Sequence, residues 1–490
     1  MTEAPDYLQR RWWALGLLCM TQFMVVLDAS IVNIALPSIG EDVGISQENL
    51  SWVVNGYVLT FGGFLLLGGR MADLLGRRRI FMAGLVIVAV ASLFAGFAPS
   101  EGALVAARAA QGLGAAIIAP SALSIVTTIF RDGSERNKAL GAWGAVAGSG
   151  GAAGVLLGGV LTDGLGWEWV MWVNVPVALI VLALTPRLIP ESRSESQTRH
   201  FDLAGAVTVT AGLSLLVYAI VDVESAGWGS TQTIALLAAA IALLGVFTAV
   251  ELRSDAPLVP FGIFRKRTLT GANVVGLMVG GSLFAMFFFI TLYMQQVLGY
   301  SAIKAGLSYL PLSLAIILSA GVASQLVTKT GFKPVLAVGL VLVAAGLVWF
   351  SRVSVDGGFT TDILGPLLLA AVGLGFAFVT TTIAAVSGIQ DREQGLASGL
   401  INTSQQIGGA LGLAALATVA NSRTDDLVAQ AGGDPAALPS ALVEGFQSAF
   451  LGGAVIAAIG LVLTLALISN RDSRAHVALS EKEDAAPVAI

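Results

Sequence analysis

Apolar residues fill long runs of this chain, and short charged or Gly/Pro-rich segments separate the runs. A helix needs roughly 20 apolar residues to cross a hydrocarbon layer of ~30 Å, and about fourteen runs reach that length. The pattern predicts an all-α integral membrane protein with fourteen transmembrane helices. The runs begin near Trp13, Ser51, Arg79, Ala103, Ala139, Glu168, Leu203, Thr231, Leu269, Ala302, Pro334, Asp362, Gly395 and Phe446.

The composition supports this interpretation. The 490 residues are 56% hydrophobic and only 12% charged, and the mean hydropathy of +0.84 lies far outside the soluble globular range. The first apolar run has no small-residue cleavage site after a short core, so we expect a retained helix rather than a signal peptide.

Basic residues predict the orientation, because Lys and Arg collect in short cytoplasmic loops. If the N-terminus is inside, 22 of the 26 basic residues fall on the cytoplasmic side. The exceptions are Lys304, Arg352 and Arg423, which would be external, and Arg108, which lies within a span. We therefore expect an even number of spans and both termini in the cytoplasm.

Several kinds of chemistry are excluded by residue type. Cys19 is the only cysteine, and His200 and His476 both fall at loop or tail positions, so we expect no disulfide, no metal site and no histidine proton relay. No phosphate-binding loop of the Gly-x-x-x-x-Gly-Lys-Ser/Thr type occurs, so ATP is not the expected energy source. An intramembrane enzyme is disfavoured because no nucleophile, base and orienting group can be assembled from the spans.

Two charged residues lie inside apolar runs, where ionisable groups are costly and usually functional. Asp28 lies ~13 Å below Pro37, and Arg108 lies ~9 Å below Gly102, at 1.5 Å rise per residue. Gln111 shares a helical face with Arg108 because residues three apart are neighbours. Asp28 and Arg108 can lie at similar depths, but the count does not decide whether they face each other.

Glycine patterns indicate an internal repeat. Gly76 and Gly84 are matched by Gly331 and Gly339, and Gly112-Leu-Gly114 is matched by Gly373-Leu-Gly375. The matches predict two six-helix halves that run in the same direction, with two further helices inserted between them. The expected organisation is an N-terminus over 1–12, a first bundle over 13–190, a linker with the inserted helices over 191–260, a second bundle over 261–470 and a tail over 471–490.

Three polar segments lie between or after the spans. The tail after Asn470 is charged and lacks an apolar face, so we expect disorder there. The segment from about Asn421 to Glu444 is predicted to be the longest external loop, and the polar stretch from Pro190 to Asp202 is predicted to precede the inserted helices.

A glycine-rich turn after the second span carries an acid beside several arginines. Its sequence is Gly69-Arg-Met-Ala-Asp73-Leu-Leu-Gly76-Arg77-Arg78-Arg79. Glycines permit a close turn, and the acid can form charge-assisted bonds that lock or release helix ends. The stretch resembles the signature loop of the major facilitator superfamily. The alternative is a solvated basic turn that serves only topology.

Three further stretches resemble the fourteen-helix drug:proton antiporters of that superfamily. They are Leu27-Asp28-Ala29-Ser30-Ile31-Val32-Asn33-Ile34-Ala35-Leu36-Pro37, then Trp167-Glu-Trp-Val-Met-Trp-Val-Asn174-Val-Pro176, and the glycines Gly150, Gly154, Gly158 and Gly159. The spacing of four places three of the glycines on one face, which permits close helix contact. Val155 stands where the family has its usual proline.

The resemblance implies the major facilitator fold and a role for each motif. Asp28 would be the proton-coupling site and Arg108 would tune it, since burial favours the neutral form of a carboxyl and a guanidinium favours the charged form. The alternative is a permanent ion pair that only positions helices. The residues expected to control the conformational change are Gly69, Asp73, Gly76, Arg77, Arg78, Gly150, Gly154 and Gly158.

The later spans carry amides and aromatic residues but almost no charge, which suits lipophilic ligands. The amides could instead join helices, and any single aromatic residue could face lipid or the core. The residues predicted to line a substrate cavity are Gln111, Asn33, Tyr57, Asn402, Gln405, Gln406, Phe284, Tyr293 and Tyr309.

The favoured function is a proton-coupled exporter of lipophilic or cationic drugs or antibiotics that works by alternating access. The alternative is a lipid transporter or lipid-binding membrane protein of the same fold. We expect a monomer in a bacterial cell membrane that contacts lipids, protons and an amphiphilic small molecule, with no nucleic acid and no cofactor beyond the proton gradient. The bacterial source is suggested by the excess of arginine over lysine and by abundant Ala, Gly and Val.

Overall fold

A computed structural model of the chain describes residues 10–45, 50, 52–130, 133–192, 202–254, 257–390, 393–432 and 434–485. These residues form helices and short connections, and no strand occurs among them. Helices suit the apolar runs because a helix bonds every backbone group internally, which hydrocarbon demands.

The helices of the first half and of the inserted pair are α2 (Arg11–Val43), α3 (Trp52–Leu75), α4 (Arg77–Ala95), α5 (Glu101–Ile129), α6 (Gly133–Leu165), α7 (Glu168–Trp172), α8 (Asn174–Leu188), α9 (Leu203–Ala226) and α10 (Thr231–Glu251). Those of the second half are α11 (Arg267–Leu292), α12 (Ala302–Ser308), α13 (Leu310–Thr330), α14 (Phe332–Phe350), α15 (Leu364–Val386), α16 (Gln394–Gln430), α17 (Leu438–Leu467) and α18 (Asn470–Ala485). Short 3₁₀ or π-helical turns cover Phe261–Arg265, Tyr293–Val297, Phe359–Ile363 and Pro435–Ala437.

Twelve helices of the described residues are long and apolar enough to cross a membrane. A thirteenth span results if the two parts of α6, which meet at a bend of 45°, are taken together. The remaining predicted span is α16, which carries a polar run from Asn402 to Gln406. The all-helical membrane fold is confirmed, whereas a total of fourteen spans stays a prediction.

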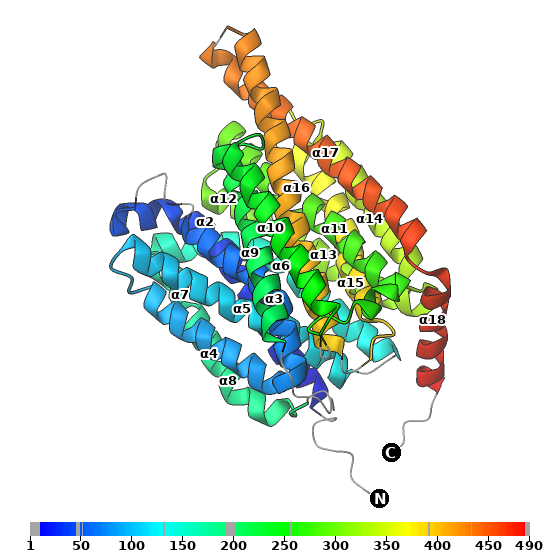
Figure 1. Cartoon of the computed structure of the whole chain (residues 1–490). Helices are drawn as coiled ribbons and strands as arrows, with labels where there is room; N and C mark the ends of the chain where they lie inside the picture. The colour runs from blue at the N-terminus through cyan, green and yellow to red at the C-terminus, as the bar shows by residue number, and fades with distance from the viewer. Residues whose placement is uncertain are drawn as a thin grey trace, which may run out of the picture.

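The helices form two bundles, with α2 to α8 in the first and α11 to α17 in the second (Figure 1). The start of α2 and the whole of α18 lie at one end of the molecule, which we call the terminal end; the opposite end is the distal end. The bundles lean apart towards the distal end, where α2 and α17 lie on opposite sides (Figure 1).

Corresponding helices of the two halves make the same close contact. A methyl group added to Gly84 would lie 2.9 Å from the carbonyl oxygen of Gly114, which joins α4 to α5, and one added to Gly339 would lie 3.0 Å from that of Gly373, which joins α14 to α15. The residues before α4 and α14 are both glycines with positive φ, 111° at Gly76 and 84° at Gly331. Glycine adopts that conformation without steric cost. These parallels support the predicted repeat.

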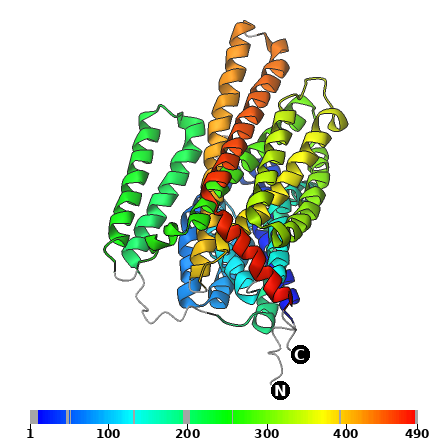
Figure 2. The same cartoon turned by 90° about the vertical axis from the view of Figure 1, so that its right-hand side faces the viewer.

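The inserted pair, α9 and α10, stands beside both bundles (Figure 2). On the first bundle, Tyr218 of α9 stacks on Trp52 of α3, with ring centroids 5.9 Å apart. On the second bundle, the indole of Trp228 donates to the hydroxyl of Thr418 on α16 at 2.9 Å. The pair therefore touches the distal parts of both bundles. Of the polar stretch Pro190 to Asp202 that precedes it, residues 193–201 lie outside the described residues.

The tail forms a helix, so the prediction of disorder is wrong for Asn470–Ala485. Composition alone indicated disorder, but the polar side chains of α18 have fixed partners at the terminal end. Ser473 accepts from the backbone N–H of Lys333 at 3.2 Å. His476 packs against the ring of Phe332 and makes a hydrogen bond of 3.0 Å with Asn137 Oδ1. The helix therefore contacts both α6 and α14.

Most of the segment from Asn421 to Glu444 is helical, so the prediction of a loop is wrong, while its external location stays a prediction. Helix α16 continues to Gln430 and α17 begins at Leu438, so the two helices project beyond the rest of the distal end as a hairpin (Figures 1 and 2). Arg423 and Glu444 form an ion pair of 2.7 Å across it. Both are half-exposed, so the pair adds little stability.

The docking of α18 is expected to weaken in acid. Burial, aided by the nearby Arg136 cation, lowers the pKa of His476 from 6.5 to about 4. Between these values the undocked helix binds the proton more readily, so stability is lost as the pH falls. We expect the hydrogen-exchange protection factors of α18 to fall on the order of tenfold from about pH 7 to about pH 5.

A matched control is His476→Gln, which keeps a hydrogen-bonding nitrogen near Asn137 but cannot titrate. Its protection factors should not change over the same pH range. If the protection factors of wild-type α18 are equally independent of pH, His476 does not control the docking of this helix.

Candidate functional site

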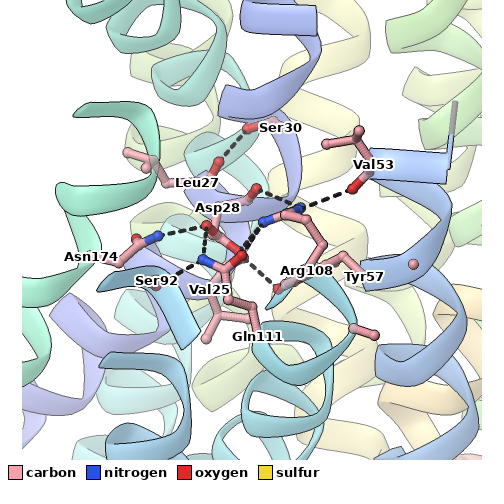
Figure 3. Close-up of polar contacts among 12 residues, drawn as sticks. Val25, Leu27, Asp28, Ser30, Val53, Tyr57, Ser92, Arg108, Gln111 and Asn174 are labelled. Atoms are coloured by element: carbon pink, nitrogen blue, oxygen red, sulfur yellow. Dashed lines mark hydrogen bonds and ion pairs between the residues drawn. The ribbon is translucent and has the colours of Figure 1, made fainter. Parts of the chain in front are cut away.

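Asp28 of α2 and Arg108 of α5 meet in the interior of the first bundle. Arg108 Nη1 donates to Asp28 Oδ2 at 2.9 Å, and Nη2 donates to the backbone carbonyl of Asp28 at 3.4 Å (Figure 3). Asp28 is 2% exposed and Arg108 0%. The two residues that stand out in the sequence are therefore in direct contact, away from solvent.

Two amides complete the surroundings of the Asp28 carboxylate. Asn174 Nδ2 donates to Oδ1 at 2.6 Å, and Gln111 Nε2 donates to the same oxygen at 3.3 Å. Gln111 also accepts from Arg108 at 2.9 Å and donates to the hydroxyl of Ser92 at 2.7 Å (Figure 3). Both carboxylate oxygens are thus bonded by side chains from α5 and α8.

Asn174 and Ser92 were not among the predicted site residues. Asn174 was visible only as a polar residue in the apolar stretch that resembles the start of the sixth helix, and Ser92 only as a hydroxyl inside a span. No spacing connects either residue to Asp28, because the contacts are made between helices far apart in the chain.

The Arg108 guanidinium is held on its other side by α3. Its Nε donates to the carbonyl of Val53 at 3.1 Å, and its Cζ lies 4.6 Å from the ring centroid of Tyr57. The Tyr57 hydroxyl donates to the carbonyl of Val25 at 3.2 Å. Stacking on an aromatic face suits a planar guanidinium.

Five helices supply this network: α2, α3, α4, α5 and α8. A buried ion pair gains little net stability, but loss of one partner typically costs about 3–5 kcal/mol because a charge is left unpaired. Among the described residues, all the partners that we identify belong to the first bundle. A rigid rotation of one bundle against the other would therefore leave the network intact.

Three residues of the first bundle are predicted to line a cavity, and they differ in their exposure. Tyr57 is 1% exposed and Gln111 is fully buried, and both belong to the Asp28 network. Asn33 lies on α2 with its side chain exposed. In this conformation only Asn33 of the three is open to its surroundings.

Tyr293 and Tyr309 of the second bundle are each 1% exposed. The Tyr293 hydroxyl donates to the carbonyl of Ser354 at 2.7 Å, and the Tyr309 hydroxyl donates to that of Phe287 at 2.9 Å. Both side chains thus form part of the packed core in this conformation.

The predicted amides on α16 are partly exposed. Asn402 donates to the carbonyl of Ser398 in its own helix at 2.8 Å. Gln405 Nε2 is buried without a hydrogen-bond partner, and Gln406 lies one residue further on. Phe284, 39% exposed, lies on α11 against Gly409 of α16. Gln405 and this aromatic ring therefore lie along the α11–α16 contact.

A hollow of about 440 Å³ lies at the distal ends of α3 and α5, and none of the residues predicted to line a cavity is among its lining residues. It combines one acid and one indole with small apolar side chains. The lining residues are Trp52, Glu101, Gly102, Val105, Ala106 and Ala109.

The segment from Gly69 to Arg79, which covers the end of α3 and the start of α4, joins the two bundles at the terminal end. Asp73 is fully buried and accepts from Arg77 at 3.0 Å. It also accepts from the backbone N–H groups of Gly395 and Leu396, at 3.1 and 3.0 Å, at the start of α16. Gly69 allows this approach, since a methyl group there would overlap the carbonyl oxygen of Gly395. One carboxylate therefore connects α3 to the second bundle.

Arg78, which follows Arg77 in the chain, has a different role within the first bundle. The backbone N–H of Arg78 donates to Glu191 at 3.1 Å, and its guanidinium donates to the carbonyl of Ile189 at 3.1 Å. These bonds tie the start of α4 to the end of α8. Arg78 therefore stabilises the connection between α4 and α8 rather than the contact between the two bundles.

The glycines of α6 fit against the part of α2 that carries Asp28. An added methyl group would lie 2.9 Å from Val26 at Gly150 and 2.6 Å from the Ile31 carbonyl at Gly158. At Gly154 the added methyl group would overlap the hydroxyl of Ser30, which lies two residues after Asp28. These contacts give the predicted glycine face a physical function, which is the close approach of α6 to α2.

Asp73→Asn is expected to loosen the terminal end. The change removes the charge that pairs with Arg77, which is 2% exposed, and loss of a buried partner costs about 3–5 kcal/mol. Spin labels at Arg79 and Lys329, in a Cys19→Ser background, should report a longer and broader distance distribution than in the parent protein.

The matched control is Asp42→Asn. Asp42 also belongs to the first bundle and accepts from the indole of Trp167 at 2.9 Å, but this bond does not reach the second bundle. Equal distance distributions for Asp73→Asn and the parent would contradict the role of Asp73 as a connection.

Gly158→Ala is expected to destabilise the first bundle by about 1–3 kcal/mol, the usual cost of an overpacked core. Gly151→Ala is the control, because a methyl group there meets nothing within 4 Å. Thermal unfolding in detergent should show a lower midpoint for Gly158→Ala alone. The packing argument fails if both variants unfold at the same temperature.

Comparison with known proteins identifies the family. Residues 18–413 match the model of the Major Facilitator Superfamily. The chain is 40% identical over 477 residues to a puromycin resistance protein of Streptomyces alboniger, covering 96% of this chain and 94% of that protein. It is 41% identical to the cephamycin export protein of Amycolatopsis lactamdurans, covering 92% of this chain and 91% of that protein.

Solved structures agree on the fold. The human organic anion transporter MFSD10 superposes with a TM-score of 0.64 at 16% sequence identity, over 94% of this chain and all of that one. The chain belongs to the Major Facilitator Superfamily and is a multi-pass efflux transporter, not an enzyme, of its drug and antibiotic resistance type.

Proposed function

We propose that this chain is a proton-coupled antiporter that exports amphiphilic drugs or antibiotics from a bacterial cell. The observation that carries the proposal is the buried Asp28–Arg108 pair, the type of intramembrane charge that usually serves transport. The names of the relatives, which refer to resistance to puromycin and export of cephamycin, support the substrate class.

The terminal end is proposed to face the cytoplasm. The distribution of basic residues supports this orientation, because 22 of 26 fall in segments assigned to that side. Asp73 bonds Gly395 across the bundles at this end, and Arg136 donates to the carbonyl of Val386 at 3.1 Å. With that orientation the structure is closed towards the cytoplasm, the state from which an exporter releases its substrate outside.

Proton exchange would act through the charge of Asp28. The ionised carboxylate binds Arg108, Asn174 and Gln111, and a protonated carboxyl would weaken its hold on Arg108. Asp28 would take up a proton from outside and give it up to the cytoplasm once per transport cycle, while the substrate moves in the opposite direction.

Protonation of Asp28 must act by changing the shape of the first bundle itself, because the hydrogen-bond network of Asp28 lies within that bundle. Helix α6 bends by 45° between Gly133–Gly151 and Ala153–Leu165. The bend lies beside Gly150 and Gly154, which contact α2 near Asp28. A change in this bend would move α2, and we propose it as the link between proton binding and the motion of the bundles.

Amphiphilic substrates suit the polar groups of the second bundle. Gln405 carries a buried amide nitrogen without a partner, next to Gln406 and one turn from Asn402. Unpaired buried donors are costly, so a substrate with an acceptor group would be bound favourably. Phe284 adds apolar surface beside these amides.

Asp28→Asn should abolish gradient-driven export without abolishing substrate binding. In inverted vesicles, we expect proton-driven movement of a fluorescent lipophilic cation to fall by roughly tenfold or more. Exchange of labelled for unlabelled substrate without a gradient should continue, because exchange requires no change in protonation.

Asp42→Asn, an acid-to-amide change on the same helix, serves as the control and should keep proton-driven export. A protonophore should reduce wild-type transport to the level of Asp28→Asn. If the wild type moves the dye equally well without a gradient and Asp28→Asn matches it, proton coupling fails and lipid transport becomes the better explanation.

A further inference from the structure

The side-chain amide of Asn174 uses its nitrogen but not its oxygen in the Asp28 network. Its Nδ2 donates to Asp28 Oδ1 at 2.6 Å, and the side chain is 1% exposed. Its Oδ1 is equally buried but has no hydrogen-bond partner. Buried polar atoms are nearly always bonded, so an orphaned acceptor beside an ionisable carboxyl requires an explanation.

The side-chain acceptors of Gln111 and Ser92 already have donors. Arg108 offers only donors. Gln111 is engaged at both ends, because its Oε1 accepts from Arg108 and its Nε2 donates to Ser92. A protonated Asp28 carries an O–H group that must donate to an acceptor. Asn174 Oδ1 is the unused acceptor in this network.

We propose that the Asn174 side-chain amide turns over when Asp28 is protonated, so that Oδ1 replaces Nδ2 and accepts a hydrogen bond from the Asp28 hydroxyl. The proton stays on Asp28, and only hydrogen bonds change. One amide atom bonds Asp28 and the other stays unused in both states, so neither state is favoured by the number of bonds. Asn174 is therefore a positioning residue that adapts to the charge of Asp28.

An interruption in the helical hydrogen bonds lies next to Asn174. Helix α7 ends at Trp172 and α8 begins at Asn174, so Asn174 stands at a break between two helices. Pro176 has no N–H to bond the carbonyl of Trp172, which accounts for the break. Val173 keeps helical dihedral angles, with φ −57° and ψ −27°, so the interruption concerns the backbone hydrogen bonds and not the direction of the chain.

Few other groups can titrate or carry charge at this position. Arg108 of α5 and Tyr57 of α3 are the charged and titratable side chains that the described residues place on Asp28. The groups that α4, α6 and α8 bring to it are Ser92, Gly154 beside Ser30, and Asn174, none of which titrates. A pH-dependent change at Asn174 therefore reports Asp28.

Infrared difference spectroscopy tests the proposal directly. The protein would be labelled with asparagine carrying ¹³C in the side-chain carbonyl, and spectra taken in acid would be compared with spectra taken in alkali. We expect the Asn174 carbonyl band to move to lower frequency on acidification, as its oxygen gains a hydrogen bond. The band should be absent in Asn174→Leu and should not move in Asp28→Asn.

Transport gives a second readout. Asn174→Leu removes both hydrogen bonds at similar volume, and the charge-assisted bond to the ionised carboxylate is the stronger of the two. The pH midpoint of proton-driven export should therefore rise by about one unit. Thr185→Val, which also removes a buried polar group from α8, should keep the wild-type midpoint.

The outcomes separate this inference from the proposed function on which it rests. If Asp28→Asn keeps proton-driven export, the proposed coupling fails and the inference fails with it. If Asp28→Asn abolishes coupling but the labelled band does not move in the wild type, or Asn174→Leu keeps the wild-type pH midpoint, the inference alone is overturned. A moving band together with a shifted midpoint supports it.

Discussion

The organisation of the first bundle depends on one constraint, which is that a carboxylate and a guanidinium lie together where water does not reach. Asp28 and Arg108 each need partners for the groups that their mutual bond leaves free, and these come from α3, α5 and α8. The backbone carbonyl of Val53, the ring of Tyr57 and the amides of Gln111 and Asn174 fill those positions. The same constraint makes the site responsive, because a change in the charge of Asp28 alters what every partner requires.

Small residues and one buried acid solve the second problem, which is to hold two bundles together reversibly. Gly69 and Gly395 bring the helix backbones together, and Asp73 bonds two backbone N–H groups of the opposite bundle. The inserted pair α9–α10 adds contacts at the other end, through Trp52 and Trp228. The terminal helix α18 adds polar contacts to both bundles.

Much of this could be predicted from the sequence, for identifiable reasons. Asp28 and Arg108 stand out because charge is rare in apolar runs, and the segment from Gly69 to Arg79 stands out because glycines and charges recur at fixed spacing. Asn174 did not stand out as their partner, since an amide gives no sign of which distant helix it faces. The tail was wrongly expected to be disordered because composition reveals missing apolar faces but not polar partners such as Asn137 and Lys333. The buried positions of Tyr293 and Tyr309 depend on packing, which residue type alone does not indicate.

The central claim is that proton uptake and release at Asp28 are coupled to movement of the substrate in the opposite direction, and proton release on substrate binding tests it most directly. Purified protein in weakly buffered detergent solution would be mixed with a lipophilic cation substrate while a pH indicator is followed. The account predicts that the wild type releases protons, that Asp28→Asn binds the substrate without releasing any, and that Asp42→Asn behaves as the wild type. Equal proton release from the wild type and Asp28→Asn would contradict it, as would substrate binding by the wild type with no release at any pH at which it transports.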